Sequence, residues 1–155
     1  MEINGVPLHP LVVHAVVVFV PLAALGALAM TVPRWRWLAR WPTLLVTLGA
    51  TAATYVATLT GRSLEQDRGL AALPLVKTHV EWGHRLMIAM WIFAVVVVVA
   101  FWVLPHVSRL SGGRDRSSPV PALVVPVQVL LVLAAIAVLA LVVLTGDAGA
   151  KAVWK

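Results

Sequence analysis

The sequence predicts an all-α protein, a four-helix transmembrane bundle of two similar hairpins related by pseudo-two-fold symmetry. Apolar residues make up 61% of the 155 residues and charged residues 12%, whereas soluble domains contain roughly 45–50% and about 25%. The mean hydropathy is +0.97. Four segments contain no Asp, Glu, Lys or Arg: 3–33, 41–61, 86–108 and 117–146. Each is long enough to cross a bilayer, which takes about 20 residues of helix.

Proline, glycine and charge mark the limits of these spans within a single integral membrane domain, residues 1–155. The spans are expected near 10–32, 42–60, 79–104 and 121–145. Pro10 suits the first turn of the first span, where a missing N–H costs nothing. Gly61 and Gly146 follow the second and fourth spans, and we expect each just beyond a helix end.

Orientation and broad class follow from the charges. The short loop 33–42 carries three Arg beside three Trp, a pattern typical of a cytoplasmic membrane interface. We therefore expect this loop and loop 105–119 in the cytoplasm and both termini outside. The net charge of +6 is assigned to the loops, and no nucleic-acid partner is expected. Without cysteine or any catalytic motif, the chain is expected to be at most an electron-transfer component and not an enzyme.

The histidines form two pairs with the same spacing. His9 and His14 begin the first span, and His79 and His84 follow them by 70 positions at the third. These two spans run in the same direction, so the four rings are expected at one membrane face and His106 at the other. Five residues turn a helix by about 500°, which leaves the two rings of one pair roughly 140° apart. One pair is therefore not expected to chelate one ion.

A short tripeptide supports the two-hairpin repeat. The second span ends in Leu59-Thr60-Gly61 and the fourth in Leu144-Thr145-Gly146. Together with the histidine spacing, these tripeptides suggest two equivalent hairpins with an axis along the membrane normal.

The leading functional hypothesis is haem b bound between the hairpins. His14 and His84 would be the metal ligands, His9 and His79 an outer pair, and Arg85 a partner of the haem propionates. Haem requires two neutral imidazoles, an apolar slot and nearby cations. Another metal or a quinone pocket is a second hypothesis. The third assigns the histidines to structural hydrogen bonds in a non-catalytic membrane scaffold or partner subunit.

The second span also carries a stripe of hydroxyl groups, Thr47, Thr51, Thr54 and Thr58. Threonine in a membrane helix bonds its own backbone or a neighbouring helix. A close-packed helix contact is therefore favoured. The competing hypothesis is the lining of a small transporter or channel, which would require a homo-oligomer.

The segment Asn4–His14 (NGVPLHPLVVH) resembles a bacterial family of predicted membrane proteins, the domain of unknown function 2231. The resemblance extends over the whole chain and implies a four-helix domain of the bacterial plasma membrane without an established activity. Some relatives are joined to Rieske or cytochrome-like modules, which implies electron transfer with a redox partner protein or quinone. Relatives often carry histidine after the final Thr-Gly, where this chain has Asp147, so a ligand at that position would be altered here.

Overall fold

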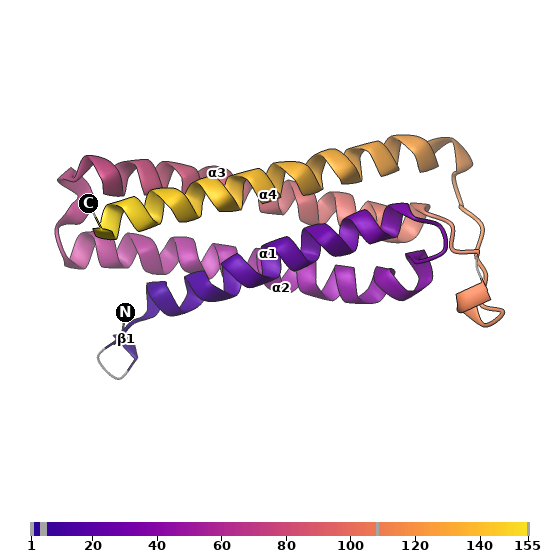
Figure 1. The fold of residues 1–155 in the computed structure, drawn as a ribbon, viewed down its shortest axis with the longest axis horizontal. Helices are drawn as coiled ribbons and strands as arrows, with labels where there is room; N and C mark the ends of the chain where they lie inside the picture. Colours follow the sequence, from indigo (N-terminus) through magenta and orange to yellow (C-terminus); the bar gives the residue numbers. More distant parts are fainter. Residues whose placement is uncertain (1, 4–5, 108, 155) are drawn as a thin grey trace.

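In a computed structural model that describes residues 2–3, 6–107 and 109–154, four long helices form an antiparallel bundle (Figure 1). They are α1 (Leu8–Thr31), α2 (Arg36–Asp67), α3 (Pro74–Val103) and α4 (Val124–Trp154). The short elements are β1 (Glu2–Ile3), β2 (Val6–Pro7), η1 (Leu70–Ala72), η2 (Arg109–Ser111) and η3 (Pro121–Leu123). β1 and β2 form one antiparallel pair, and the η elements are single 3-10 turns. The predicted all-α bundle is confirmed.

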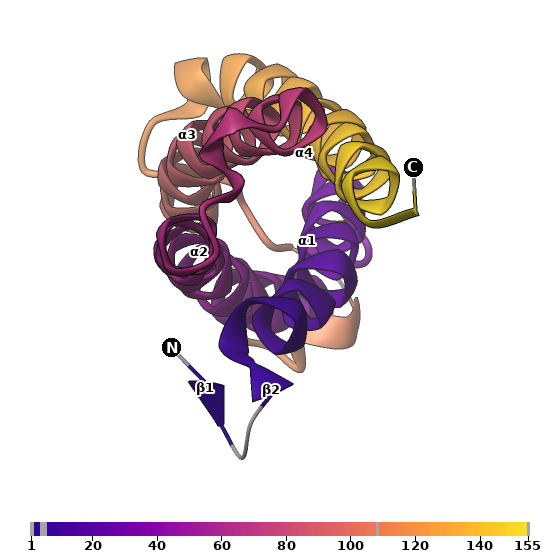
Figure 2. The same cartoon turned by 90° about the vertical axis from the view of Figure 1, so that its left-hand side faces the viewer.

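The helices follow one another around the bundle axis in chain order. Contacts within each hairpin, α1 with α2 and α3 with α4, are more extensive than those between the hairpins, α2 with α3 and α1 with α4. Helices α1 and α3 lie diagonally across the axis, as the end-on view shows (Figure 2). Side chains on α1 and α3 that point inward therefore meet on the axis.

Each helix is longer than its predicted span, and the two proposed end glycines were assigned wrongly. Gly61 and Gly146 lie inside α2 and α4 and do not follow their ends. An internal glycine costs a helix only about 1 kcal/mol, which tertiary contacts readily offset. Helix α2 ends at Asp67, and Gly69, with φ +65°, provides the left-handed residue that the chain needs after it.

Each helix buries one face and leaves large apolar side chains exposed on the others. The buried stripe of α1 consists of Val16, Val20, Ala23, Ala24, Ala27 and Met30. On the outside, Leu45 is 63% exposed, and Ile92 and Leu133 are each 58% exposed. All four helices are long and apolar enough to span a membrane. The exposed side chains face the region that lipid would occupy, so the chain is a membrane protein.

Helices α1 and α2 approach each other closely at Gly26. A Cβ at this position would overlap the Oγ1 atom of Thr43 on α2. Small residues permit such an approach between membrane helices, where association depends on packing and not on the exclusion of water. Gly26 therefore sets the separation within the first hairpin.

Substitution of Gly26 by alanine is expected to separate α1 from α2 and to lower the free energy of unfolding by about 1–3 kcal/mol, as overpacking does. Gly49→Ala is the matched control, because Gly49 is exposed and no atom lies within 4 Å of its hypothetical Cβ. Thermal unfolding in detergent should give a lower midpoint for Gly26→Ala alone. Equal midpoints for the two variants would contradict the close contact.

Candidate functional site

The polar side chains gather at the two ends of the bundle. At the histidine end, on the left in Figure 1, α1 and α3 begin and α2 and α4 end. It holds His9, His14, His79 and His84, as predicted. The opposite end, the loop end, consists of residues 32–35, 104–107 and 109–123 with the adjoining helix turns. It holds His106, also as predicted.

His9 connects the two helices of the first hairpin. Its Nδ1 lies 2.9 Å from the carbonyl oxygen of Ala57 on α2. Because a carbonyl only accepts, this Nδ1 carries the proton and donates it. A Cβ at Gly61 would lie 3.0 Å from the Cε1 atom of His9. Glycine thus leaves the space that the imidazole occupies.

His79 makes the same contact in the second hairpin. Its Nδ1 donates to the carbonyl oxygen of Thr145 on α4 at 3.0 Å. A Cβ at Gly149, four residues further along α4, would lie 2.9 Å from the Cε1 atom of His79. Each hairpin therefore holds one imidazole between a backbone carbonyl and a glycine one helical turn beyond it.

This shared contact changes the alignment of the two hairpins. The tripeptides 59–61 and 144–146 suggested that Gly61 and Gly146 are equivalent. In the structure, the glycine that corresponds to Gly61 by its contact with histidine is Gly149. The tripeptide match is therefore three residues out of register with the packing. The pseudo-two-fold symmetry of the whole bundle stays a prediction.

The two inward imidazoles meet near the bundle axis. The ring centroids of His9 and His79 are 6.1 Å apart and the ring planes are inclined by 69°. Both side chains are half-buried. Within the described residues, neither Nε2 has a hydrogen-bond partner. With the proton on Nδ1, each Nε2 offers a lone pair that can bind a metal ion or a proton.

The prediction that His14 and His84 face the interior was wrong. Both side chains are exposed on the outside of the bundle. The Nδ1 of His14 bonds only within its own helix, to the carbonyl oxygen of Pro10 at 2.6 Å. Because the spacing of five residues points the two rings of each pair in different directions, only one ring of a pair can face the axis. In the first pair this is His9, and in the second pair it is His79.

The buried stripes explain which member faces inward. On α1 the stripe begins at Val16, seven residues after His9, and on α3 at Leu86, seven residues after His79. Seven residues make almost two turns, so each histidine continues the stripe of its helix. The spacing of seven residues is present in the sequence, but it identifies the inward histidine only once the buried face of a uniformly apolar helix is known.

Arg85 shares the outward position of His84. It is exposed, and its guanidinium carbon lies 4.5 Å from the centre of the Trp82 ring. This contact is a cation–π interaction within one turn of α3. The structure does not bring Arg85 and the paired rings of His9 and His79 into a common contact.

The threonine stripe of α2 faces the bundle interior. The hydroxyl groups of Thr51, Thr54 and Thr58 donate to carbonyl oxygens four residues earlier, at 2.8–2.9 Å. Thr47 is buried, and its hydroxyl has no partner among the described residues. Bonding within the helix leaves a smooth surface for close packing, which fits the helix-contact interpretation.

The loop end contains a network that the sequence analysis did not identify. Arg36 is 4% exposed, and it donates three hydrogen bonds to backbone carbonyls. These go to Met30 at 2.7 Å, Thr31 at 3.1 Å and Pro105 at 2.7 Å. Carbonyls at helix C-terminal ends lack helical donors and carry partial negative charge. Arg36 therefore caps the end of α1 and ties it to the segment that follows α3, without a carboxylate.

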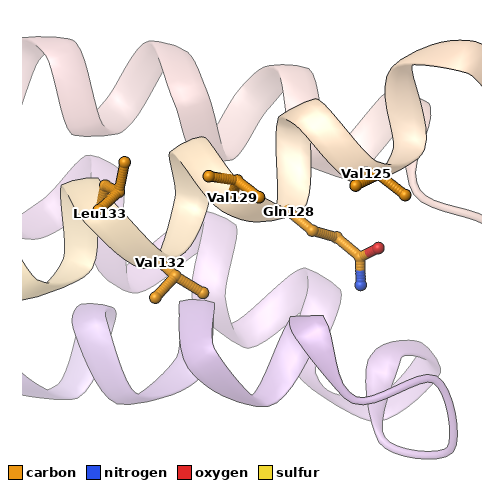
Figure 3. Close-up of a pocket in the computed structure, with 5 residues that line it drawn as sticks. All are labelled: Val125, Gln128, Val129, Val132 and Leu133. Carbon is orange, nitrogen blue, oxygen red and sulfur yellow. The ribbon is translucent and has the colours of Figure 1, made fainter.

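A second contact to the same turn of α1 comes from α4. The Nε2 of Gln128 donates to the carbonyl oxygen of Thr31 at 3.1 Å. In Figure 3 the Gln128 amide extends from α4, beside an apolar groove formed with Val125, Val129, Val132 and Leu133. Gln128 therefore joins α4 to the end of α1.

His106 is the centre of the second part of this network. It is 4% exposed and its ring nitrogens lie 2.9 and 3.1 Å from an Nη of Arg40. Burial and the charges of Arg40 and Arg116 lower the pKa of His106 from 6.5, with a further contribution from Arg36; Asp115 acts in the opposite direction. The ring is therefore neutral at pH 7.

Acidification below pH 6.5 is expected to destabilise the loop end. The unfolded chain protonates His106 near its ordinary pKa of about 6.5, and the folded chain does so only at lower pH. The contribution of the neutral His106 ring to stability is complete above about pH 6.5, and it is lost as the pH falls through the lowered pKa of the folded state. The midpoint of unfolding should fall more between about pH 7.5 and 5.5 in the wild type than in His106→Gln. An identical fall in both would contradict this assignment.

Replacement of Arg36 by leucine is expected to lower the free energy of unfolding by about 3 kcal/mol, since it leaves buried carbonyls without their charged donor. Arg34→Leu is the control, because Arg34 is exposed and its loss is expected to change stability by about 0.5 kcal/mol or less. Chemical unfolding in detergent measures both. A loss no larger in Arg36→Leu than in the control would contradict the role of Arg36 in the fold.

Comparisons with known proteins support the membrane assignment. No match is found among curated proteins or among solved structures. The family described as predicted membrane protein (DUF2231) matches residues 5–155, which is nearly the whole chain. The histidine pair, the glycines beneath it and the arginine network all lie in the matched region. The chain therefore belongs to the DUF2231 family of predicted membrane proteins.

Proposed function

We propose that this membrane protein binds haem b between its two hairpins, with His9 and His79 as the axial ligands, and takes part in electron transfer. The observation that carries the proposal is the pair of imidazoles 6.1 Å apart. Two imidazoles that share one metal ion through bonds of about 2 Å have ring centres roughly 6 Å apart. This pair replaces the ligands His14 and His84 expected from the sequence.

The hydrogen bonds of the two rings suit metal ligation. Metal-binding histidines commonly donate the second ring N–H to a carbonyl, which fixes the tautomer and increases the basicity of the ligating nitrogen. Ala57 and Thr145 provide these carbonyls. On the other side of each ring, Gly61 and Gly149 lack the Cβ atom that would occupy the space of the imidazole. The chain thus orients both Nε2 lone pairs without any charged partner.

The number of donors favours haem over a bare ion. The described residues contain no group of three or more His, Cys, Asp or Glu side chains that could hold a metal ion. A structural zinc site usually takes four protein ligands. Haem iron brings four ring nitrogens and needs only two axial ligands. When bound, the group would supply reversible one-electron transfer.

The test is the absorption spectrum of protein purified in mild detergent after expression with a haem precursor. A Soret band, with separate α and β bands after reduction, is expected in the wild type. His9→Ala and His79→Ala should lose these bands. His14→Ala and His84→Ala, which alter exposed rings on the same helices, should retain them. Loss of the bands in His14→Ala and His84→Ala alone would overturn the ligand assignment. A folded wild-type protein without these bands would overturn haem binding.

A non-catalytic membrane scaffold or partner subunit is the alternative function. It is favoured by the same hydrogen bonds, because each imidazole also joins the two helices of its own hairpin. In this case the protein is colourless, and His9→Ala lowers the midpoint of thermal unfolding while His14→Ala does not.

We also propose that the protein lies in the bacterial plasma membrane with the histidine end outside the cytoplasm. The basis is the loop end, where Arg34, Arg36 and Arg40 lie close to Trp35, Trp37 and Trp41. A dense group of arginines in a short loop favours the cytoplasmic side. A redox partner or quinone would then meet the histidine end from the outer surface. Reporter fusions to the C-terminus test this orientation.

A further inference from the structure

The loop end holds more positive charge than the chain neutralises. Around His106 lie the guanidinium groups of Arg36, Arg40 and Arg116, with Asp115 as the opposing charge. Asp115 accepts a hydrogen bond from Ser111. Among the described residues, no carboxylate lies within ion-pair distance of any of the three guanidinium groups.

The three arginines differ in how far their donors are used. Arg36 is committed to three carbonyls. Arg40 has one Nη near the His106 ring, and its Nε is buried without a partner. Arg116 donates one Nη to the carbonyl oxygen of Trp102 and is partly exposed. Arg40 and Arg116 therefore retain both charge and unused donors.

Aromatic rings surround this charge. The guanidinium carbon of Arg40 lies 4.5 Å from the Phe101 ring centre, 5.4 Å from that of Trp37 and 5.7 Å from that of Trp41. Arg116 lies 5.5 Å from the ring of Trp102. Tryptophans at the end of a membrane helix mark the level of the lipid headgroups. The unneutralised cations are thus at the depth of lipid phosphates.

We propose that Arg40 and Arg116, beside His106, form a binding site for the phosphate group of an anionic phospholipid. A partly buried guanidinium without a counter-charge is costly, and a phosphate matches its planar set of donors. Basic pockets between membrane helices bind lipid headgroups in this way. Because the site lies at the end of the bundle opposite His9 and His79, it does not depend on haem binding.

The experiment is native mass spectrometry of the detergent-purified protein with added phosphatidylglycerol, phosphatidylcholine or inorganic phosphate. Phosphatidylglycerol should bind more tightly than phosphatidylcholine, whose choline cation the arginines repel. Arg40→Gln and Arg116→Gln should each weaken phosphatidylglycerol binding by about fivefold, the effect of one arginine near a charged membrane surface. Arg34→Gln and Arg114→Gln are the controls, since both arginines are exposed at the same end of the bundle.

The remaining outcomes decide between lipid and free phosphate. Inorganic phosphate at millimolar concentration should not displace the lipid. Displacement that is lost in Arg116→Gln would overturn the lipid assignment in favour of free phosphate. Equal phosphatidylglycerol binding by the wild type, Arg116→Gln and Arg114→Gln would overturn the site. Arg40→Lys keeps the positive charge and replaces Arg40→Gln if that variant does not fold. If Arg40→Lys binds phosphatidylglycerol as tightly as the wild type and Arg116→Gln binds it more weakly, the site recognises the lipid through positive charge.

Discussion

The constraint on which this structure depends is that every backbone polar group within the lipid must find its partner inside the protein. Helices alone meet it here, because each satisfies its own N–H and C=O groups. The sequence accordingly places its charges at the ends of four long apolar segments. Burial from water cannot then decide how the helices face one another, because lipid is as apolar as the bundle interior. Shape and a few polar contacts decide it.

Four polar side chains near the ends of the bundle bond across segments in the same way. His9, His79, Arg36 and Gln128 each donate to a backbone carbonyl of a neighbouring segment. A carbonyl oxygen has two lone pairs, so it accepts such a bond even when it already belongs to a helix. These four side chains thereby find acceptors without a buried carboxylate. These contacts tie the helices together at both ends, while small residues and apolar side chains fill the middle.

The two ends nevertheless differ in chemistry. At the histidine end, two half-buried imidazoles on diagonal helices have their ring centroids 6.1 Å apart. At the loop end, guanidinium groups carry permanent charge among tryptophans, and this charge keeps His106 neutral. The first arrangement suits ligation of a metal centre and the second suits an anion. The bundle separates these sites by the full length of its helices.

The sequence by itself determined the four helices, their antiparallel order and the end at which each histidine lies, because charge-free length and chain direction are local properties. It did not determine which of His9 and His14, or His79 and His84, faces the axis. Helices α1 and α3 are apolar on every side, so no amphipathic pattern marks their buried faces. The sequence also did not show that Gly61 corresponds to Gly149, or that Arg36 bonds to the carbonyls at the end of α1. Only the tertiary structure decided these two features. Both depend on how one helix is rotated against another, which close packing of particular side chains decides.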